Sequence, residues 1–298
     1  MLSPDYSSAE NNAGGGVLYL VGTPIGNLED ITLRALRVLK EVNLIACEDT
    51  RETQKLLTRY DIHTRTLSYH QHNEMVRAPE LVLELEQGMK VALVSDAGMP
   101  GISDPGHHLI ALAIRHGIPV VPIPGASAFL AALAASGLST ENFHFAGFLP
   151  ARRTQRRKAL RALAAYEGTL VFYEAPHRLR ESLHDLLDVL GDCYAVIARE
   201  VTKLHEEFLR GHVSQLLEAL KERPVRGELT LLVSPDARPP TPKVRGRPGL
   251  IGRRVVQLQK QRGLDLKGAL KVVARERGLS RDEAYRRLQE EKALGQGS

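Results

Sequence analysis

The sequence predicts an α/β protein with two α/β domains and a small helical appendage, and three features of the chain support this fold class. Short apolar runs alternate with segments of helical period over most of the 298 residues, which is the pattern of βαβ units around a mostly parallel sheet. The length suits two domains of ordinary size, each with its own core. A stretch rich in proline, glycine and charge then separates a last, basic segment from the rest.

The first domain is predicted over residues 17–140. The tail at 1–16 has neither the basic nor the apolar region of a signal peptide, and we expect it to be disordered. After the first apolar run, Leu33, Leu36, Leu39 and Val42 recur with a spacing that places them along one helix face. Strands are predicted at 17–21, 43–47, 65–69, 90–95 and 118–123, with helices at 31–42 and 73–88.

The second domain is predicted over residues 141–236, starting near the turn-rich segment GFLPARR. The alternation of apolar runs and helical segments resumes there, which favours a second α/β layer structure. Helices are predicted at 154–166 and 177–190, and strands at 169–173, 194–198 and 228–233.

The third segment consists of a linker at 237–249 and a basic helical appendage at 250–298. The prolines, glycines and charges of the linker are typical of a chain that packs little. In the appendage, two short helices are expected to meet at Gly278 and Leu279, with Ser280 as the N-cap of the second and Glu283 completing a capping box. Such a unit suits nucleic-acid docking, and it suits dimerisation or packing nearly as well.

The composition excludes several classes of protein. A hydrophobic content of 43% and a charged content of 25% are those of a globular chain. The two cysteines, Cys47 and Cys193, are too few and too far apart for a disulfide framework, which favours the reducing cytoplasm. The longest apolar runs fall far short of the roughly 18 residues of a membrane span, so no membrane partner is expected.

Positive charge is concentrated in two places. Residues 238–298 contain 16 Lys or Arg against six Asp or Glu, whereas the whole chain has a net charge of only +5. A second cluster lies in the segment ARRTQRRKALRAL. Both clusters suit a phosphate backbone, and a solvated helix face is the alternative that charge alone leaves open. The cations of the second cluster are Arg152, Arg153, Arg156, Arg157, Lys158 and Arg161.

Three loops that follow predicted strands have the composition of ligand-binding loops. In an open parallel sheet, ligands bind outside the carboxyl ends of the strands. The loops are VGTPIGNLED, SDAGMPGISDPG and PIPGASA, which are rich in residues that let a backbone approach a ligand. Helix capping by Asp96 and Asp104, and close helix packing after Gly125, are the structural alternatives.

Other chemistries lack their motifs. The chain has neither the GxGxxG pattern of a dinucleotide site nor the GxxxxGK[ST] pattern of a P-loop, so NTP hydrolysis is not expected. His63, His70 and His72 have no thiol or carboxylate partners at ligand spacing, so no metal site is expected.

The loops occur together with further motifs in an order that is typical of one family. The chain closely resembles the bacterial 16S ribosomal RNA cytidine ribose 2′-O-methyltransferases of the tetrapyrrole methylase superfamily. The resemblance covers residues 17–236, and the helical appendage fits the small extra domain of that family. The motifs that carry it are GTPIGNL from Gly22, CEDTR from Cys47, SDAGMPGISDPG from Ser95, PGASA from Pro124, GFLP from Gly147, FYEAPHRL from Phe172 and REVTK from Arg199.

The resemblance implies two α/β/α domains of the tetrapyrrole methylase type that hold S-adenosylmethionine in the cleft between them, usually in a homodimer. The implied reaction is methylation of the ribose 2′-oxygen of cytidine 1402 in 16S ribosomal RNA, within the 30S subunit. Carried over by position, the cofactor-binding residues are Thr23, Pro24, Asp96, Ala97, Gly98, Met99, Ser103, Ala126, Ser127, Tyr173, Glu174 and Leu229.

Methyl transfer to a hydroxyl benefits from a positioned base. Near the ends of second-domain strands the sequence offers Glu174, Glu200 and Lys203 as catalytic candidates, with His177 nearby, and does not choose among them. An ion pair of Glu200 with Arg199 or Lys203 is the structural alternative. Contacts to RNA are expected from Arg152, Arg153, Arg156, Arg157, Lys158 and Arg199.

The chain departs from the family pattern at two positions. Met99 stands where a threonine is expected, which removes a hydroxyl, and Val201 stands where leucine is usual. Two other functions remain as alternatives. One is a methyltransferase of the same fold that acts on a tetrapyrrole precursor, and the other is a non-catalytic RNA-binding protein of ribosome assembly.

Overall fold

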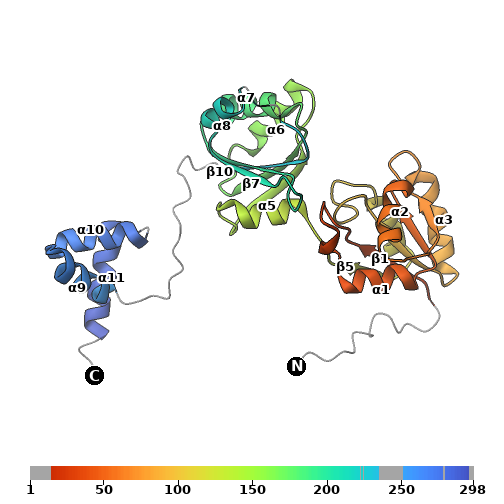
Figure 1. The fold of residues 1–298 in the computed structure, drawn as a ribbon, viewed down its shortest axis with the longest axis horizontal. Helices are drawn as coiled ribbons and strands as arrows, with labels where there is room; N and C mark the ends of the chain where they lie inside the picture. The colour runs from red at the N-terminus through yellow and green to blue at the C-terminus, as the bar shows by residue number, and fades with distance from the viewer. Residues whose placement is uncertain (1–14, 222, 224, 235–250, 278, 295–298) are drawn as a thin grey trace. The chain divides into compact units, whose positions relative to one another are not determined.

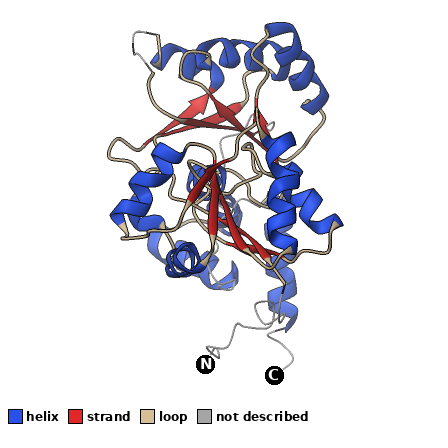
Figure 2. Cartoon of the chain, turned by 90° about the vertical axis from the view of Figure 1, so that its right-hand side faces the viewer, coloured by secondary structure: helices blue, strands red, loops and turns tan. Residues whose placement is uncertain are grey.

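The computed structural model divides the chain into two compact units, residues 1–237 and 238–298. It describes residues 15–294 apart from 222, 224, 235–250 and 278. The predicted linker at 237–249 and all but the last two residues of the predicted N-terminal tail lie outside the described residues. Figure 1 shows the order of the elements along the chain, and Figure 2 shows the strands of each sheet together with the helices that cover them.

The first sheet is parallel throughout, as predicted, with strand order β3-β2-β4-β1-β5. Alternate residues of β1 enter opposite cores: Val17, Tyr19 and Val21 pack on one side of the sheet and Leu18 on the other. Both faces are therefore buried. The strands are β1 (Val17–Val21), β2 (Leu44–Cys47), β3 (Thr66–Ser68), β4 (Lys90–Val94) and β5 (Val120–Ile123), and the helices are η1 (Leu28–Asp30), α1 (Leu33–Glu41), α2 (Thr50–Arg59), α3 (Glu74–Glu86) and α4 (His107–Arg115).

The predicted face of α1 is confirmed except at its first residue. Leu39 and Val42 are buried and Leu36 packs against them, but Leu33 is 86% exposed, and Ala35 and Val38 complete the buried face. A strict three-residue repeat drifts around a helix of 3.6 residues per turn, whereas positions 35, 38, 39 and 42 stay on one stripe. The start of the helix is set by Thr32, whose side chain accepts a hydrogen bond from the Ala35 N–H.

The second sheet is mostly antiparallel, which corrects the prediction of a mostly parallel sheet. Its strand order is β6-β7-β10-β8-β9, and only β6 and β7 run parallel. The sequence prediction missed β6 and β9 because exposed edge residues interrupt their apolar alternation. The strands are β6 (Phe143–Phe148), β7 (Thr169–Glu174), β8 (Tyr194–Arg199), β9 (Glu207–His212) and β10 (Leu229–Ser234), and the helices are α5 (Ala128–Ser136), α6 (Arg153–Leu163), α7 (Leu179–Leu190) and α8 (Val213–Ala219).

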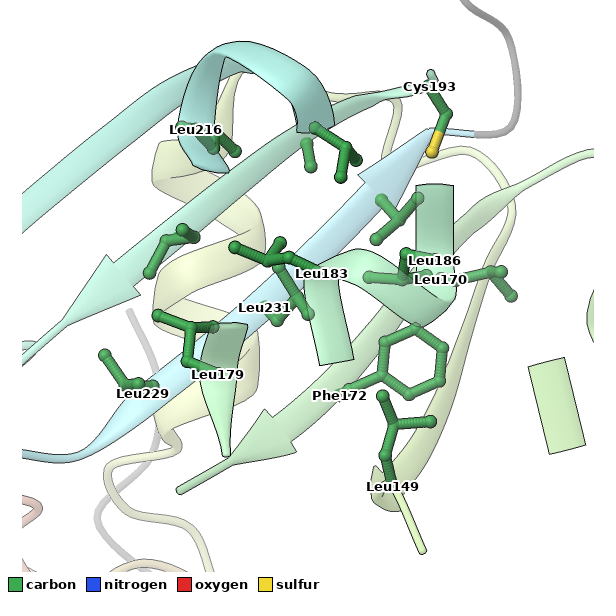
Figure 3. Close-up of a cluster of buried hydrophobic side chains, with 14 of the residues drawn as sticks. Leu149, Leu170, Phe172, Leu179, Leu183, Leu186, Cys193, Leu216, Leu229 and Leu231 are labelled. Carbon is green, nitrogen blue, oxygen red and sulfur yellow. The ribbon is translucent and has the colours of Figure 1, made fainter. Parts of the chain in front are cut away.

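The second sheet also has a core on each face. Figure 3 shows the larger one, in which Phe172, Leu183 and Leu231 are fully buried. On the opposite face, α5 contributes Ala132 and Leu133 to a core with strand residues of β7, β8 and β10. Helix α5 thus packs on the second sheet although it precedes residue 140.

The unit formed by residues 238–298 has three helices among its described residues rather than the two that were predicted. These are α9 (Ile251–Arg262), α10 (Leu266–Arg277) and α11 (Arg281–Leu294), and they share a core that includes Val255, Val273 and Leu288. The predicted N-cap is confirmed, since the Ser280 hydroxyl accepts a hydrogen bond from the Glu283 N–H. Gly278 lies outside the described residues.

Both cysteines are buried and free of disulfides. Within the part of the chain that the structure describes, no helix has the length and apolarity to cross a membrane.

Candidate active site

The loops after β1 and β4 are tied together at the carboxyl edge of the first sheet. Thr23 and Gly98 exchange two backbone hydrogen bonds of 2.9 and 3.1 Å. The buried Thr23 hydroxyl also donates to the Ser95 carbonyl at 3.0 Å. Gly98 has a φ of +88°, which favours glycine. Thr23 and Gly98 therefore shape the loop, and the proton of the Thr23 hydroxyl is already donated to the Ser95 carbonyl.

The loop after β5 approaches the same place. A Cβ on Gly22 would lie 2.8 Å from the Gly125 Cα and 2.8 Å from the Met99 Sδ. A Cβ on Gly98 would lie 3.7 Å from the Ala126 carbonyl oxygen. Met99, where a threonine was expected, thus places its thioether against the Gly22 backbone. Ser127 directly precedes α5 and its side chain makes no capping hydrogen bond.

A pocket of about 190 Å³ opens beside these loops. Its wall is mostly apolar and includes Asp96, and the next residue, Ala97, is exposed. Cofactor sites usually enclose roughly 300–1,000 Å³, so this pocket has room for one part of a larger ligand. The lining residues are Thr23, Pro24, Gly26, Leu28, Thr53, Leu56, Ser95 and Asp96.

Four carboxylates lie near one another at this edge. Glu48 and Asp49 belong to the loop after β2, and Asp96 and Asp104 belong to the loop after β4. Asp49 caps α2 through the Arg51 N–H, and Asp96 accepts a hydrogen bond from the Asp49 N–H at 3.0 Å. Burial raises the pKa of Glu48 and of Asp96, and nearby carboxylates add to both shifts. The edge is therefore negative and partly desolvated.

Asp104 is the most strongly affected member of this group. Burial, together with the nearby charges of Glu48 and Asp96, raises the pKa of Asp104 to about 6, although a hydrogen bond from the Ser95 hydroxyl opposes the change. Asp104 is not a helix cap, which is the structural alternative that its position in the sequence leaves open, because α4 begins after Gly106 with no side-chain cap. A carboxyl in a glycine-rich loop after a buried strand was the signal that pointed to a chemical role.

Three of the predicted site residues of the second domain lie in one row across the second sheet. Leu229 in β10 is paired with Glu174 in β7 and with Arg199 in β8. The structure therefore brings three predicted site residues together, although they are far apart in the sequence. Burial raises the pKa of Tyr173, next to Glu174, and a hydrogen bond that its hydroxyl oxygen accepts from the Phe129 backbone N–H opposes this shift.

The loops of the two sheets meet at two points. A Cβ on Gly147 would lie 3.3 Å from the Ser103 Oγ, and one on Gly26 would lie 2.4 Å from the Lys203 Cγ. Ser103 has a φ of +64°, so its backbone is strained at this contact.

Glu174 is buried and fully engaged. One carboxylate oxygen accepts hydrogen bonds from the Arg178 Nη2 at 2.7 Å and from the Ala175 N–H at 2.8 Å. The other accepts from the Ser182 hydroxyl. These contacts fix the start of α7 against β7 and use the lone pairs that a base would need.

Glu200 and Lys203 form an ion pair in a strained turn, as the structural alternative foresaw. The Lys203 Nζ lies 2.9 Å from Glu200 and 3.2 Å from Glu228. Burial opposes both shifts, but the hydrogen bonds and charges of the pair lower the pKa of Glu200 and raise the pKa of Lys203. Glu200 and Thr202 have φ values of +50° and +71°. Lys203 therefore stays protonated, and Glu200 is a weak base.

The basic helix α6 is partly committed to α7. Arg156 is 1% exposed and its Nε lies 2.8 Å from the equally buried Asp185. The prediction that Arg156 contacts RNA is therefore wrong, because its guanidinium is sealed in an ion pair. Arg153 and Arg157 also bind Asp185 or Asp188 but remain partly accessible.

Other predicted RNA contacts remain available. Arg152 and Lys158 are exposed and have no carboxylate partner among the described residues. Arg199 pairs with Glu207 at 3.1 Å, and Glu207 is shared with Arg223 at 2.7 Å. Two guanidinium groups on one carboxylate leave a net positive charge.

Comparison with known proteins gives consistent results. The family model of the tetrapyrrole (corrin/porphyrin) methylases matches residues 17–217. The ribosomal RNA small subunit methyltransferase I of Halalkalibacterium halodurans is 47% identical over 91% of this chain and 93% of its own length. The proteins of the same name from Streptococcus pyogenes serotype M1 and Bacillus subtilis are 42% and 48% identical, over 92% and 73% of this chain and 94% and 75% of their own lengths.

Solved structures show the same fold at low identity. Diphthine synthase superposes with a TM-score of 0.58 at 15% identity, covering 74% of this chain and 90% of its own. A cobalt-precorrin-4 methyltransferase of cobalamin biosynthesis gives 0.54 at 18% identity, covering 74% and 96%. These likenesses support the fold over about three quarters of the chain and say nothing about the substrate.

Proposed function

This chain belongs to the tetrapyrrole (corrin/porphyrin) methylases and, within them, to the ribosomal RNA small subunit methyltransferase I family, and on that premise we propose that it methylates the ribose 2′-oxygen of a cytidine in small-subunit ribosomal RNA. The proposed methyl donor is S-adenosylmethionine, the proposed nucleotide is cytidine 1402 of 16S RNA, and the compartment is the cytoplasm. The observation that carries the proposal is the 47% identity over nearly the whole length of a relative that bears this name.

The alternatives receive less support. The cobalamin enzyme that shares the fold is 18% identical, and a uroporphyrin-III C-methyltransferase from Thermus thermophilus is 22% identical. Sequence identity at that level shows a common fold and does not indicate a common substrate. A purely RNA-binding role does not account for the loops gathered at the edge of the first sheet.

The residues at this edge fit S-adenosylmethionine. The close backbones of Gly22 and Gly125 leave no space for side chains, and Asp96 is one of the residues that line a mostly apolar pocket. The cofactor supplies a methyl group on a positively charged sulfur, and a negative edge attracts such a cation. Asp96 would accept hydrogen bonds from its polar groups, while Tyr173 and Leu229 would cover its adenosine.

For the proton of the ribose hydroxyl we propose Asp104. Its carboxyl lies in the cofactor loop and close enough to Tyr173 to affect the pKa of that residue. A base with a pKa near the working pH transfers protons efficiently. Glu174 is saturated by hydrogen bonds, Lys203 carries a proton and Glu200 is paired with it, so these three candidates fit positioning better than proton transfer.

The RNA would be held by exposed cations. Arg152, Lys158 and the Arg199–Arg223 pair supply charge on the unit of residues 1–237, and the net charge of +10 on residues 238–298 supplies more. We also propose a homodimer, which light scattering on the purified protein tests directly.

The decisive experiment is transfer of labelled methyl from S-adenosylmethionine to 30S subunits from a strain that lacks this protein, followed by nucleoside mass analysis. A 2′-O-methylcytidine product supports the proposal. Labelling of a different nucleoside, or no labelling of RNA while a tetrapyrrole precursor is methylated, contradicts it. Because the target lies in a folded ribosomal site, 30S particles should be better substrates than purified 16S RNA, and equal rates would contradict that expectation.

A further inference from the structure

The strand β6 ends in an aromatic side chain that the proposed chemistry does not use. Phe148 is 56% exposed, which is unusual for a phenylalanine at the edge of a site. Its ring centroid lies 5.5 Å from that of Tyr173, and Tyr173 lies 5.0 Å from Phe145. Phe145 in turn stacks on Phe129 at 4.2 Å. Phe148 is thus the exposed end of a row of four rings whose other members are partly buried.

The backbone conformation of β6 places the Phe148 ring against Tyr173. The pairing of β6 with β7 shifts register between Phe145 and Phe148, and Gly147 within the shift has a φ of +64°. Alternation along a regular strand would send residues 145 and 148 to opposite faces. The irregularity brings both rings onto Tyr173, which is how a β-bulge redirects a side chain beside a functional site.

The ring also lies beside the proposed cofactor loop. Gly147 approaches the Ser103 hydroxyl, and Asp104 follows directly in the chain. In the other direction, Arg152 is exposed four residues after Phe148 and has no carboxylate partner among the described residues. Proteins hold single-stranded RNA with exposed aromatic rings that stack on bases and with cations that pair with phosphates, and this short segment offers one of each.

We propose that Phe148 is a stacking platform for a base of the bound RNA strand, and that it holds the target nucleotide against the loop that contains Asp104. This inference rests on the proposed RNA methyltransferase function and adds a positioning residue to it. The ligand is an unstacked nucleobase, and the adenine of the cofactor is assigned instead to Tyr173 and Leu229.

The sequence offers a direct probe because it contains no tryptophan. Phe148→Trp keeps a stacking ring and introduces a single tryptophan, which can be excited selectively over the eight tyrosines. With cofactor bound, titration with a short oligocytidine RNA should quench this fluorescence, whereas an abasic RNA of the same length and charge should not. Phe143→Trp is the matched control, since Phe143 is 39% exposed at the opposite end of the same strand. Equal quenching by both RNAs, or equal quenching of both variants, would overturn the proposal.

Kinetics test the role in the reaction. Phe148→Ala should lower kcat/KM for 30S subunits by about 5- to 150-fold, the usual range for loss of one stacked base. Phe148→Trp and Phe143→Ala should stay near the wild-type value, and the Kd for S-adenosylmethionine and the thermal unfolding temperature should not change. Wild-type rates in Phe148→Ala, a weaker cofactor Kd, or a change of oligomeric mass by light scattering would each contradict the inference. Failure of the wild-type protein to methylate 30S subunits would instead contradict the proposed function.

Discussion

Asp104 and Glu174 are both carboxylates at the edge of a sheet, but their surroundings suit them to different tasks. Glu174 is enclosed by Arg178, Ser182 and the Ala175 N–H, which together fix its position. Asp104 is partly buried among other carboxylates and has the Ser95 hydroxyl as its favourable partner. Environment rather than residue type therefore separates the structural acid from the proposed base.

If Asp104 is the base, wild-type kcat/KM should rise with pH through about 6, where its carboxyl ionises. Asp104→Asn should abolish this limb and lower kcat/KM by about 10²- to 10⁴-fold. The control is Asp61→Asn, at an exposed residue far along the chain from the site loop. A pH–rate profile of Asp104→Asn that matches wild type would rule out the assignment.

The same group has a consequence for stability. Because its pKa is higher in the folded than in the unfolded state, the native protein binds the proton more tightly, and stability falls as pH rises from about 4 to about 6. Asp104→Asn should therefore unfold at a higher temperature than wild type above pH 6, with the difference vanishing near pH 4. Scanning calorimetry across this range measures it, and a less stable variant at pH 7.5 would contradict the sign.

Among the elements, helices α6 and α7 are joined by ion pairs. These pairs use cations of α6 that the sequence predicts to contact RNA. Arg156 and Asp185 are each 1% exposed and hydrogen-bonded to one another. Arg156→Ala leaves Asp185 buried without its main partner, which should cost about 3–5 kcal/mol of unfolding free energy in urea titrations. Arg152→Ala, at the exposed start of the same helix, should change it by less than about 0.5 kcal/mol. Similar losses in both variants would show that the buried ion pair is not responsible.

The loops after β1 and β5 illustrate how backbone contact constrains an element. Gly22→Ala would bring a Cβ to 2.8 Å from the Gly125 Cα, and a backbone atom cannot rotate away. We expect the loops to separate, with a cofactor Kd raised at least tenfold and a stability loss of about 1–3 kcal/mol. Gly15→Ala, where no atom lies within 4 Å, is the control. Isothermal titration of both variants tests this, and unchanged cofactor affinity in Gly22→Ala would contradict it.

In the whole molecule, the two compact units differ in both fold and net charge. Residues 1–237 contain both sheets, whereas residues 238–298 have a separate helical core and a net charge of +10. A chain cut after Ala237 should keep its cofactor Kd but bind RNA more weakly, with a smaller slope of log K against log salt, because fewer counterions are released. Loss of cofactor binding on truncation would show that the last unit stabilises the site.

The α/β class, the parallel first sheet and the basic third segment can all be predicted from the sequence, as can the proximity of the loops after β1, β4 and β5 at the carboxyl edge of that sheet. Those features depend on local periodicity and on loops that directly follow their own strands. Three other features could not be predicted in this way. Strand β10 runs antiparallel and brings Glu174, Leu229 and Arg199 into one row, Arg156 is buried against Asp185, and a bulge turns Phe148 toward Tyr173. Strand direction, ion pairing and burial depend on partners distant in the chain, and one-dimensional patterns carry no information about which partners meet.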